Sequence, residues 1–165
     1  MAATYEPIAT TTLTTSATGI TFTSIPSTYT DLRVVWVGKL TAGGGGLRMN
    51  FNSNSSNIFS YTSMRGNGST VLSEGSVNNS QALINYSLGA QLSFVTVDIF
   101  SYANTNIDKT MLATASEDFN GSGTVNRSVN LFRSNSAINR IDLATLFGDL
   151  FVAGTTATLY GILKA

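Results

Sequence analysis

The feature that most constrains this chain is the alternation of apolar and polar residues in short segments separated by turns. In the segment 91–102, Val95, Val97 and Ile99 fall on one face of an extended chain. The segment 31–40 alternates in the same way. A period of two residues is typical of β-strands, because successive side chains point to opposite faces of a sheet. The sequence shows no comparable helical period and therefore predicts a chain built from strands.

Turn-forming residues divide the chain into these strands. Glycine runs at 43–46 and 121–123 and an Asn-Gly pair at 67–68 separate apolar segments, and we interpret 69–80 as a long Ser/Asn loop. About nine or ten strands are expected on this basis. The strand at 31–40 carries apolar side chains on both faces, so we expect it to be central and covered on both sides.

Many short strands between turns, without a convincing helix, are typical of a β-sandwich or barrel. We predict an all-β fold, a single antiparallel, jelly-roll-like β-sandwich domain over residues 1–165. An immunoglobulin-like sandwich is the second choice. Residues 1–17 are rich in threonine and lack a strong core pattern, so we expect them to form an extended N-terminal arm.

The charge of the chain excludes several partners. Nine basic and nine acidic residues give a net charge of zero, and charged residues make up only 11% of the chain, against a usual ~25%. With no basic excess to neutralise phosphates, we expect no nucleic-acid binding. No stretch approaches the ~18 apolar residues of a membrane span, and the first residues lack the pattern of a signal peptide. Instead, Thr, Ser and Asn make up 58 of the 165 residues, which predicts an uncharged, hydrogen-bonding surface.

The residue types that are absent narrow the possible chemistry. The chain has no histidine and no cysteine, which excludes Ser-His-Asp and Cys-His nucleophiles and metal sites built on those ligands. We therefore predict no catalytic residue, no cofactor and no metal site, and expect that the chain is not an enzyme.

Three local features suggest a site, and each has a simpler explanation. Asp98 shares a strand face with Phe94, which could raise its pKa, but we expect instead that it pairs with an arginine or faces solvent near a strand end. Glu117 and Asp118 could offer oxygens to Ca²⁺, but the ordered spacing of a calcium loop is missing, so we expect a solvated turn. Trp36 could stack on a sugar, but a single tryptophan in an apolar strand indicates the core.

Three stretches, at 4–13, 20–32 and 157–162, together with 51–62, carry a resemblance to a known group of proteins. The most specific of them is Ser-Ile-Pro-Ser-Thr-Tyr-Thr-Asp-Leu at 24–32. With these motifs the chain resembles small β-sandwich structural proteins of tailed bacteriophages, which are frequent in aquatic phages including those of cyanobacteria. The resemblance touches both ends and much of the first half. It implies a structural role in the virion and brings no catalytic residues with it.

On this resemblance, the expected function is that of a capsid decoration or cement protein on the virion surface. We expect a homotrimer that binds the major capsid protein and stabilises the assembled shell. The residues expected to make this contact belong to the arm and are Ala2, Ala3, Thr4, Tyr5, Glu6, Pro7 and Ile8. The alternative is a tail-fibre or receptor-binding module, whose loops at 43–46 and 67–79 would recognise a host glycan or protein.

Overall fold

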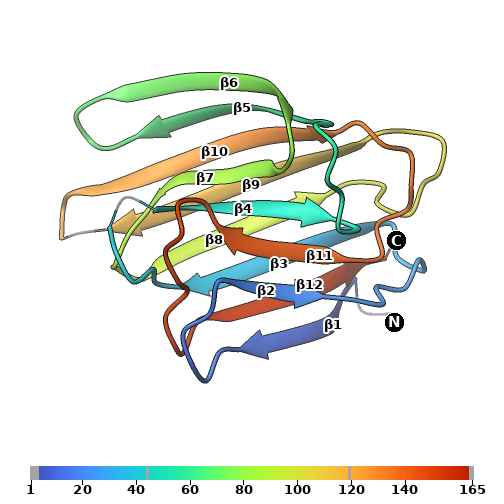
Figure 1. Ribbon diagram of the computed structural model, residues 1–165, viewed down its shortest axis with the longest axis horizontal. Helices are drawn as coiled ribbons and strands as arrows, with labels where there is room; N and C mark the ends of the chain where they lie inside the picture. The colour runs from blue at the N-terminus through green and yellow to red at the C-terminus, as the bar shows by residue number, and fades with distance from the viewer. Residues whose placement is uncertain (1–3, 44, 119, 164–165) are drawn as a thin grey trace.

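The computed structural model describes residues 4–43, 45–118 and 120–163. These residues form twelve β-strands, and no helix is present among them (Figure 1). The predicted all-β class is confirmed, although the number of strands is slightly higher than expected. In chain order the strands are β1 (Tyr5–Thr12), β2 (Gly19–Phe22), β3 (Asp31–Gly38), β4 (Gly45–Phe51), β5 (Phe59–Gly66), β6 (Val71–Asn79), β7 (Ala82–Leu88), β8 (Ser93–Ile99), β9 (Lys109–Asp118), β10 (Gly123–Phe132), β11 (Ile141–Thr145) and β12 (Thr156–Ile162).

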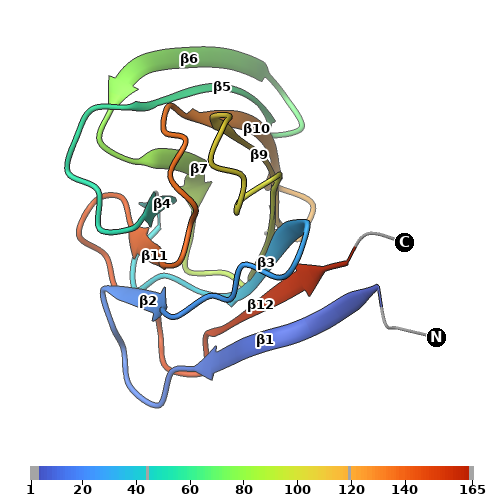
Figure 2. The same ribbon diagram turned by 90° about the vertical axis from the view of Figure 1, so that its right-hand side faces the viewer.

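The strands form two sheets that pack face to face. The larger sheet has eight strands in the order β1-β12-β3-β8-β9-β10-β5-β6, and the smaller has four in the order β2-β11-β4-β7. All the pairs are antiparallel. Figure 2 shows the smaller sheet lying against one face of the larger one, which curves around it. The predicted jelly-roll-like antiparallel sandwich is the fold observed.

The apolar core lies under β3 and β8, where the alternation in the sequence is clearest. Leu32, Val34 and Trp36 on β3 are buried, as are the apolar residues that alternate along β8. The Trp36 ring lies 5.5 Å from the ring of Phe151, which packs across the sandwich. β3 is central, as expected, but its second face, with Val35, is only half-buried. The expectation that both faces are covered is therefore wrong for the described residues, because the smaller sheet packs on one side alone.

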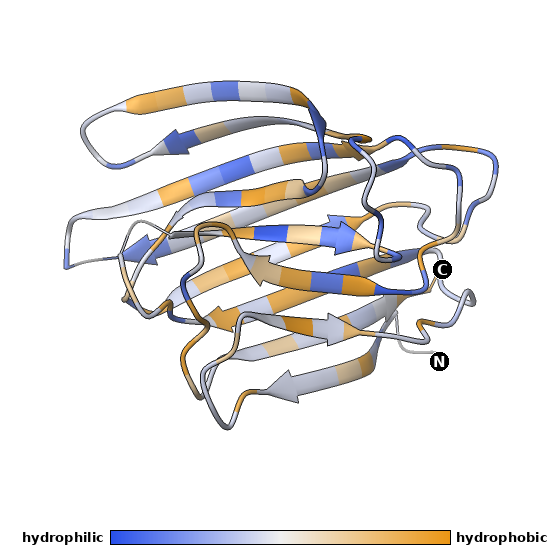
Figure 3. Cartoon of the chain, in the orientation of Figure 1, coloured by the Kyte–Doolittle hydropathy of each residue, from blue (hydrophilic) through white to orange (hydrophobic). Residues whose placement is uncertain are grey.

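A second zone of contact between the sheets, which we call the polar seam, is formed by Asn126, Ser128 and Asn130 of β10 against β7. All three residues are buried. The Ser128 hydroxyl lies 3.2 Å from the carbonyl oxygens of both Leu83 and Ile84, and the Asn130 amide donates to that of Leu83 at 2.9 Å. Since β7 is an edge strand of the smaller sheet, the side chains of β10 supply the donors that a further strand would supply. Hydrophilic bands run along β10 in Figure 3.

The segment expected as a Ser/Asn loop at 69–80 is mostly strand β6. None of its nine residues is buried, so β6 has almost no alternation for a sequence pattern to detect. It forms because its backbone pairs with β5, with Ser73 opposite Met64. Only the turn before it is as predicted, with Gly68 at a φ of 85°. β6 was mistaken for a loop because backbone pairing, which leaves no pattern in the sequence, is what holds it in the sheet.

The described part of the expected arm, residues 4–17, lies along the larger sheet. β1 pairs antiparallel with β12 of the same chain, and Ile8 packs against the core. Threonine hydroxyls meet across this pair, 3.1 Å apart at Thr10–Thr158 and 3.2 Å apart at Thr12–Thr156. Such cross-strand pairs stabilise a sheet without apolar burial. This segment is therefore an edge strand of the domain and does not extend away from it.

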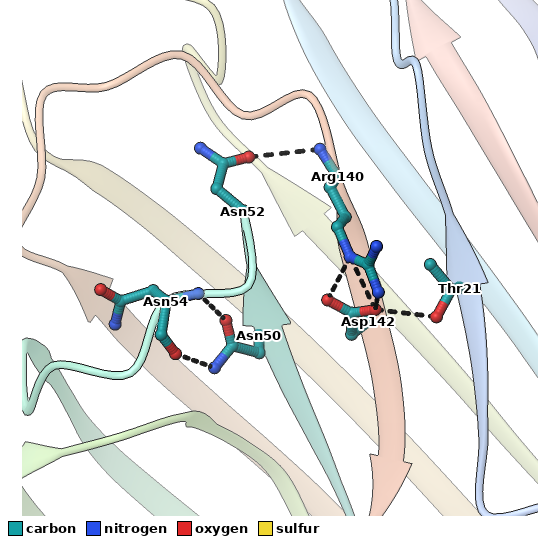
Figure 4. A network of polar contacts seen from close by, with 6 residues as sticks. All are labelled: Thr21, Asn50, Asn52, Asn54, Arg140 and Asp142. Atoms are coloured by element: carbon teal, nitrogen blue, oxygen red, sulfur yellow. Dashed lines mark hydrogen bonds and ion pairs between the residues drawn. The ribbon is translucent and has the colours of Figure 1, made fainter.

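Asparagines hold the turn that follows β4 (Figure 4). The Asn50 side chain accepts a hydrogen bond from the Asn54 amide at 3.0 Å and donates to its carbonyl at 2.8 Å. Asn52 and Ser53 have φ values of 54° and 52°, and asparagine tolerates such values better than most residues. The Asn52 side chain accepts a hydrogen bond from the Arg140 amide at 3.2 Å. These contacts tie the turn to the segment that leads into β11.

Candidate functional site

The face of the larger sheet that points away from the smaller sheet, which we call the outer face, exposes a set of apolar side chains. Strand register and alternation place seven large apolar residues there, each between 46% and 73% exposed. Two pairs of them line shared hollows, Phe94 with Val125 and Val77 with Val129, and exposed apolar patches typically mark a site of interaction. The seven are Tyr5, Met64, Val71, Val77, Phe94, Val125 and Val129.

Charge is scarce on the outer face. Asp98, a candidate from the sequence, accepts two hydrogen bonds from the Arg33 guanidinium at 2.6 and 2.9 Å. Its pairing with an arginine is therefore the explanation that holds. Arg33 also lies over the ring of Tyr5 at 5.4 Å. Arg127 also lies on this face, and no ion pair is found for it among the described residues.

A groove crosses one end of the outer face. Its volume is about 680 Å³, and its apolar walls include Val37, Leu92, Phe94 and Val125. It lies where β3, β8, β9 and β10 end, next to the turn that joins β5 to β6. The groove gives the outer face a concave, apolar area at this end.

A second candidate site, which we call the β7 cleft, lies on the other side of the β5–β6 hairpin. The cleft has a volume of about 250 Å³, and its wall includes Arg48, Tyr61, Asn79, Tyr86 and Phe147. These residues come from β4, β5, the end of β6, β7 and the turn after β11. The fold thus brings together side chains that are up to 99 positions apart in the sequence.

The rings and charges of the β7 cleft are arranged around Tyr86. The Arg65 guanidinium lies over the Tyr86 ring at 5.7 Å, and Phe147 meets that ring edge-on, also at 5.7 Å. Burial raises the pKa of Tyr61, and the nearby Glu74 and Tyr86 raise it further. Glu74 itself lies 3.4 Å from the Ser63 hydroxyl. The cleft therefore combines Arg48 with aromatic rings, while Arg65 lies over one of those rings and one carboxylate is nearby.

An ion pair forms part of the exposed side of the smaller sheet. Arg140 donates to Asp142 at 2.7 Å, and Asp142 also accepts a hydrogen bond from Thr21 at 2.7 Å (Figure 4). Burial would raise the pKa of Asp142, but the hydrogen bonds from Arg140 and Thr21 outweigh it and lower that pKa below the ordinary value. The arrangement anchors β11 to β2 and leaves Asp142 a poor proton donor or acceptor near neutral pH.

Glu117 does not lie in a solvated turn, as the sequence analysis expected. It belongs to β9 and is buried. Its carboxylate accepts hydrogen bonds from the Gly89 amide at 2.7 Å and the Ser93 hydroxyl at 3.1 Å. Strand β9 extends three residues beyond Ala115, where the apolar pattern ends, and its alternation turns this side chain inward. Asp118 follows the turn prediction, since it accepts a hydrogen bond from the Gly121 amide at 2.9 Å.

The residues expected to bind a partner through an arm are distributed over both faces of β1. Ala2 and Ala3 lie outside the described residues. Tyr5 and Pro7 lie on the outer face, whereas Glu6 points to the other side and accepts a hydrogen bond from the Tyr29 hydroxyl at 3.1 Å. Thr4 is exposed and Ile8 is half-buried.

The loops expected to recognise a receptor are shorter than predicted. In the glycine run, Gly45 and Gly46 are buried at the start of β4, and a side chain at Gly46 would meet the carbonyl oxygen of Asn85 at 2.6 Å. Gly43 is exposed, and Gly44 lies outside the described residues. Trp36, the other candidate for stacking on a ligand, is buried in the core as expected.

Further findings concern metals and membranes. In residues 4–43, 45–118 and 120–163 there is no group of three acidic residues placed to hold a metal ion. The described part of the chain also contains no helix long and apolar enough to span a membrane.

The candidate residues that sequence reasoning missed are Arg48, Arg65 and Phe147. Each looks unremarkable in the sequence, as an isolated arginine or aromatic residue within a strand or turn. The signal that could have found the arginines is that neither has an acidic residue within four positions along the chain. That signal is weak, since most ion pairs in sheets join residues on different strands.

The comparisons with known proteins are sparse. No protein-family model matches the chain, and no curated protein matches it. A solved structure that matches is a double mutant of the alginate lyase Aly36B in complex with an alginate tetrasaccharide. It is 9% identical, the match covers 94% of this chain and 81% of that one, and the TM-score is 0.29.

This match corrects the prediction that the chain is not an enzyme. The solved structure is that of an enzyme, so that prediction, which rested only on missing residue types, no longer stands. A TM-score of 0.29 is at the same time too low to assign any activity to this chain.

Proposed function

We propose that the chain is a structural protein of a bacteriophage virion that decorates the capsid and binds the major capsid protein through the outer face. The observation that carries this proposal is the apolar character of that face. Seven large apolar side chains are exposed on it, and its Arg33 is neutralised by Asp98.

The chemistry of the outer face suits a protein partner. Protein interfaces have a core depleted in charge and a polar rim. Here the exposed apolar residues of β5, β8 and β10 lie among threonines such as Thr62, Thr96 and Thr114. Docking would remove the apolar groups from water and leave the hydroxyls to form hydrogen bonds across the interface. Tyr5 and Pro7, from the segment expected to bind the partner, would belong to this contact.

The proposed mechanism is thermodynamic. A protein that binds the assembled shell more tightly than its free subunits stabilises the shell by mass action. As a homotrimer it would hold three such faces at once, and linked contacts raise the apparent affinity without any new interaction. The resemblance noted in the sequence supports the virion as the place of action.

The alternative is a tail-fibre or receptor-binding module. It is favoured by one specific observation, the β7 cleft with its arginines and aromatic rings. Under this alternative the same outer face would hold the chain in the tail.

Immunogold labelling of purified virions tests the location. Label on the heads is the expected result, whereas label confined to the tail, or no label on any particle, contradicts the proposal. Light scattering of the free protein tests the trimer, which a monomeric mass would refute.

A charge introduced on the outer face tests the contact itself. Phe94→Glu should reduce the occupancy of the capsid about tenfold or more, because a buried unpaired carboxylate opposes docking. The matched control is Ile107→Glu, since Ile107 is 48% exposed, against 47% for Phe94, but lies in the loop between β8 and β9. Equal occupancy for the two variants would place the contact elsewhere.

A further inference from the structure

We infer that the β7 cleft binds an acidic saccharide, with a sugar carboxylate against Arg48 and Arg65 and the sugar ring against Phe147. This inference goes beyond the proposed function and does not depend on it, because the cleft and the outer face lie on opposite sides of the larger sheet.

The first argument is charge. Arg33 and Arg140 each have a carboxylate partner, at 2.6 and 2.7 Å. For Arg48 and Arg65 no carboxylate oxygen lies within 4.0 Å in the described part of the chain. In a nearly uncharged protein, Arg48 therefore lines the cleft without an ion pair, and Arg65, which also has none, lies over the ring of Tyr86 in the cleft wall. A guanidinium binds a carboxylate through two parallel hydrogen bonds, which makes arginine a specific receptor for that group.

The second argument is a pair of unsatisfied donors. The Nε atom of Arg48 and the Nδ2 atom of Asn79 are buried and have no hydrogen-bond partner among the described residues. A buried donor left unpaired costs about 1–3 kcal/mol, so a ligand that supplies an acceptor there would offset that cost. Both residues line the cleft.

The third argument is the aromatic wall. Phe147 is 58% exposed, although it meets Tyr86 edge-on. It stands on a tight turn in which the next residue, Gly148, has a φ of 86°. The turn holds the Phe147 ring in the cleft wall, where the exposed part of the ring can pack against an apolar surface of a ligand. The C–H face of a pyranose ring offers such a surface, and the hydroxyls around it suit the amides of Asn79 and Gln81 in the wall.

The fourth argument is size. At about 250 Å³, the cleft is smaller than the ~300–1,000 Å³ of sites for drug-sized ligands. It suits one sugar ring of a longer chain. A glutamate-rich peptide would offer the same charge, but it has no ring to cover Phe147. The combination of two arginines, an open aromatic ring and side-chain amides thus favours a uronate-type sugar.

The test is a titration of the full chain with trigalacturonate, followed by amide chemical shifts in NMR. We expect millimolar binding or tighter, with the largest shifts at Gln81, Tyr86 and Phe147. Maltotriose, a neutral trisaccharide, should bind at least about tenfold more weakly. No shift at ~10 mM trigalacturonate, or equal binding of maltotriose, would overturn the inference. Competition by hexaglutamate at equal strength would also overturn it, in favour of a peptide site.

Variants locate the site. Arg65→Gln and Phe147→Ala should each weaken binding of trigalacturonate about tenfold, which corresponds to about 1.4 kcal/mol. Arg127→Gln is the matched control, because Arg127 also has no ion pair in the described residues but lies on the outer face. Arg48→Gln should abolish binding, and if it does not fold, the other two variants decide. Equal affinity for wild type, Arg65→Gln and Phe147→Ala would show that the cleft is not the site.

Discussion

Beneath β3 and β8 the two sheets meet through apolar side chains, whereas β10 meets β7 through the polar seam. In the apolar zone, Trp36 and Phe151 are fully buried and lie ring to ring. In the seam, Ser128 and Asn130 are as deeply buried, but they act through hydrogen bonds to the backbone of β7. Apolar packing is not directional, while a hydrogen bond requires its partner at one place. The difference suggests that the apolar zone supplies stability and that the seam fixes where β7 lies.

The largest effect is expected in the apolar zone. Trp36→Ala should lower the free energy of unfolding by about 3–5 kcal/mol, because it removes a fully buried ring and leaves a cavity. Urea denaturation measures this difference. A loss below about 1 kcal/mol would mean that the apolar zone is not the main source of stability.

A smaller effect is expected in the polar seam. Ser128→Ala should cost about 1–3 kcal/mol, because its hydroxyl donates one buried hydrogen bond to the backbone of β7, at Leu83 or Ile84, and the variant removes it. Ser116→Ala on the exposed side of β9 is the control and should leave stability nearly unchanged. If the two serine variants unfold at the same urea concentration, the seam contributes nothing measurable.

Lys109 extends the comparison to a charged group on the inner side of β9. Its ammonium is buried and donates to the carbonyl oxygens of Ile107 at 2.6 Å and Ser134 at 3.3 Å. Burial lowers the pKa of Lys109, although the nearby Asp108 opposes this. The unfolded state then binds more protons between the folded pKa and the ordinary value of about 10.4, so this group makes stability rise with pH in that window.

Lys109→Met should remove this rise. The measurement is the difference in the free energy of unfolding between variant and wild type across alkaline pH, since the tyrosines titrate in both proteins. A difference that does not change with pH would show that Lys109 titrates alike in the folded and unfolded chains.

The smallest effect is expected at the end of the seam. Thr124 is half-buried, and its hydroxyl reaches the carbonyl oxygen of Ser87 at a long 3.4 Å. Thr124→Val should therefore change stability by less than about 1 kcal/mol. A loss as large as that of Ser128→Ala would extend the seam to the full length of β10.

The strands that sequence analysis placed well are those with one buried face. In β8, Val95, Val97 and Ile99 are buried in alternation with more exposed residues. The sequence shows the same alternation of apolar and polar side chains over most of the strand. β6 has no buried residue, so nothing in its composition separated it from a loop. The turn at Gly68 was predictable for a different reason, because a positive φ selects glycine locally.

The candidate sites were less accessible to sequence analysis. Sequence analysis expected Asp98 to pair with an arginine but did not identify which one. Arg33 is its partner because β3 lies beside β8. Glu117 was expected in a turn and is buried, since the length of β9 is set by its pairing with β10. The β7 cleft depends on the position of Phe147 beside Tyr86, which no local pattern records.

The amino-acid sequence alone determined that this protein is an all-β chain with an uncharged surface, because burial on one face of a strand imposes a two-residue period and because composition sets charge directly. Only the tertiary structure decided that β1 closes onto β12, that β10 caps the edge of β7 with side chains, and that an arginine and an exposed phenylalanine line one cleft. These features depend on which strands become neighbours. That choice is made by contacts between residues far apart in the chain, and such contacts leave no local period in the sequence.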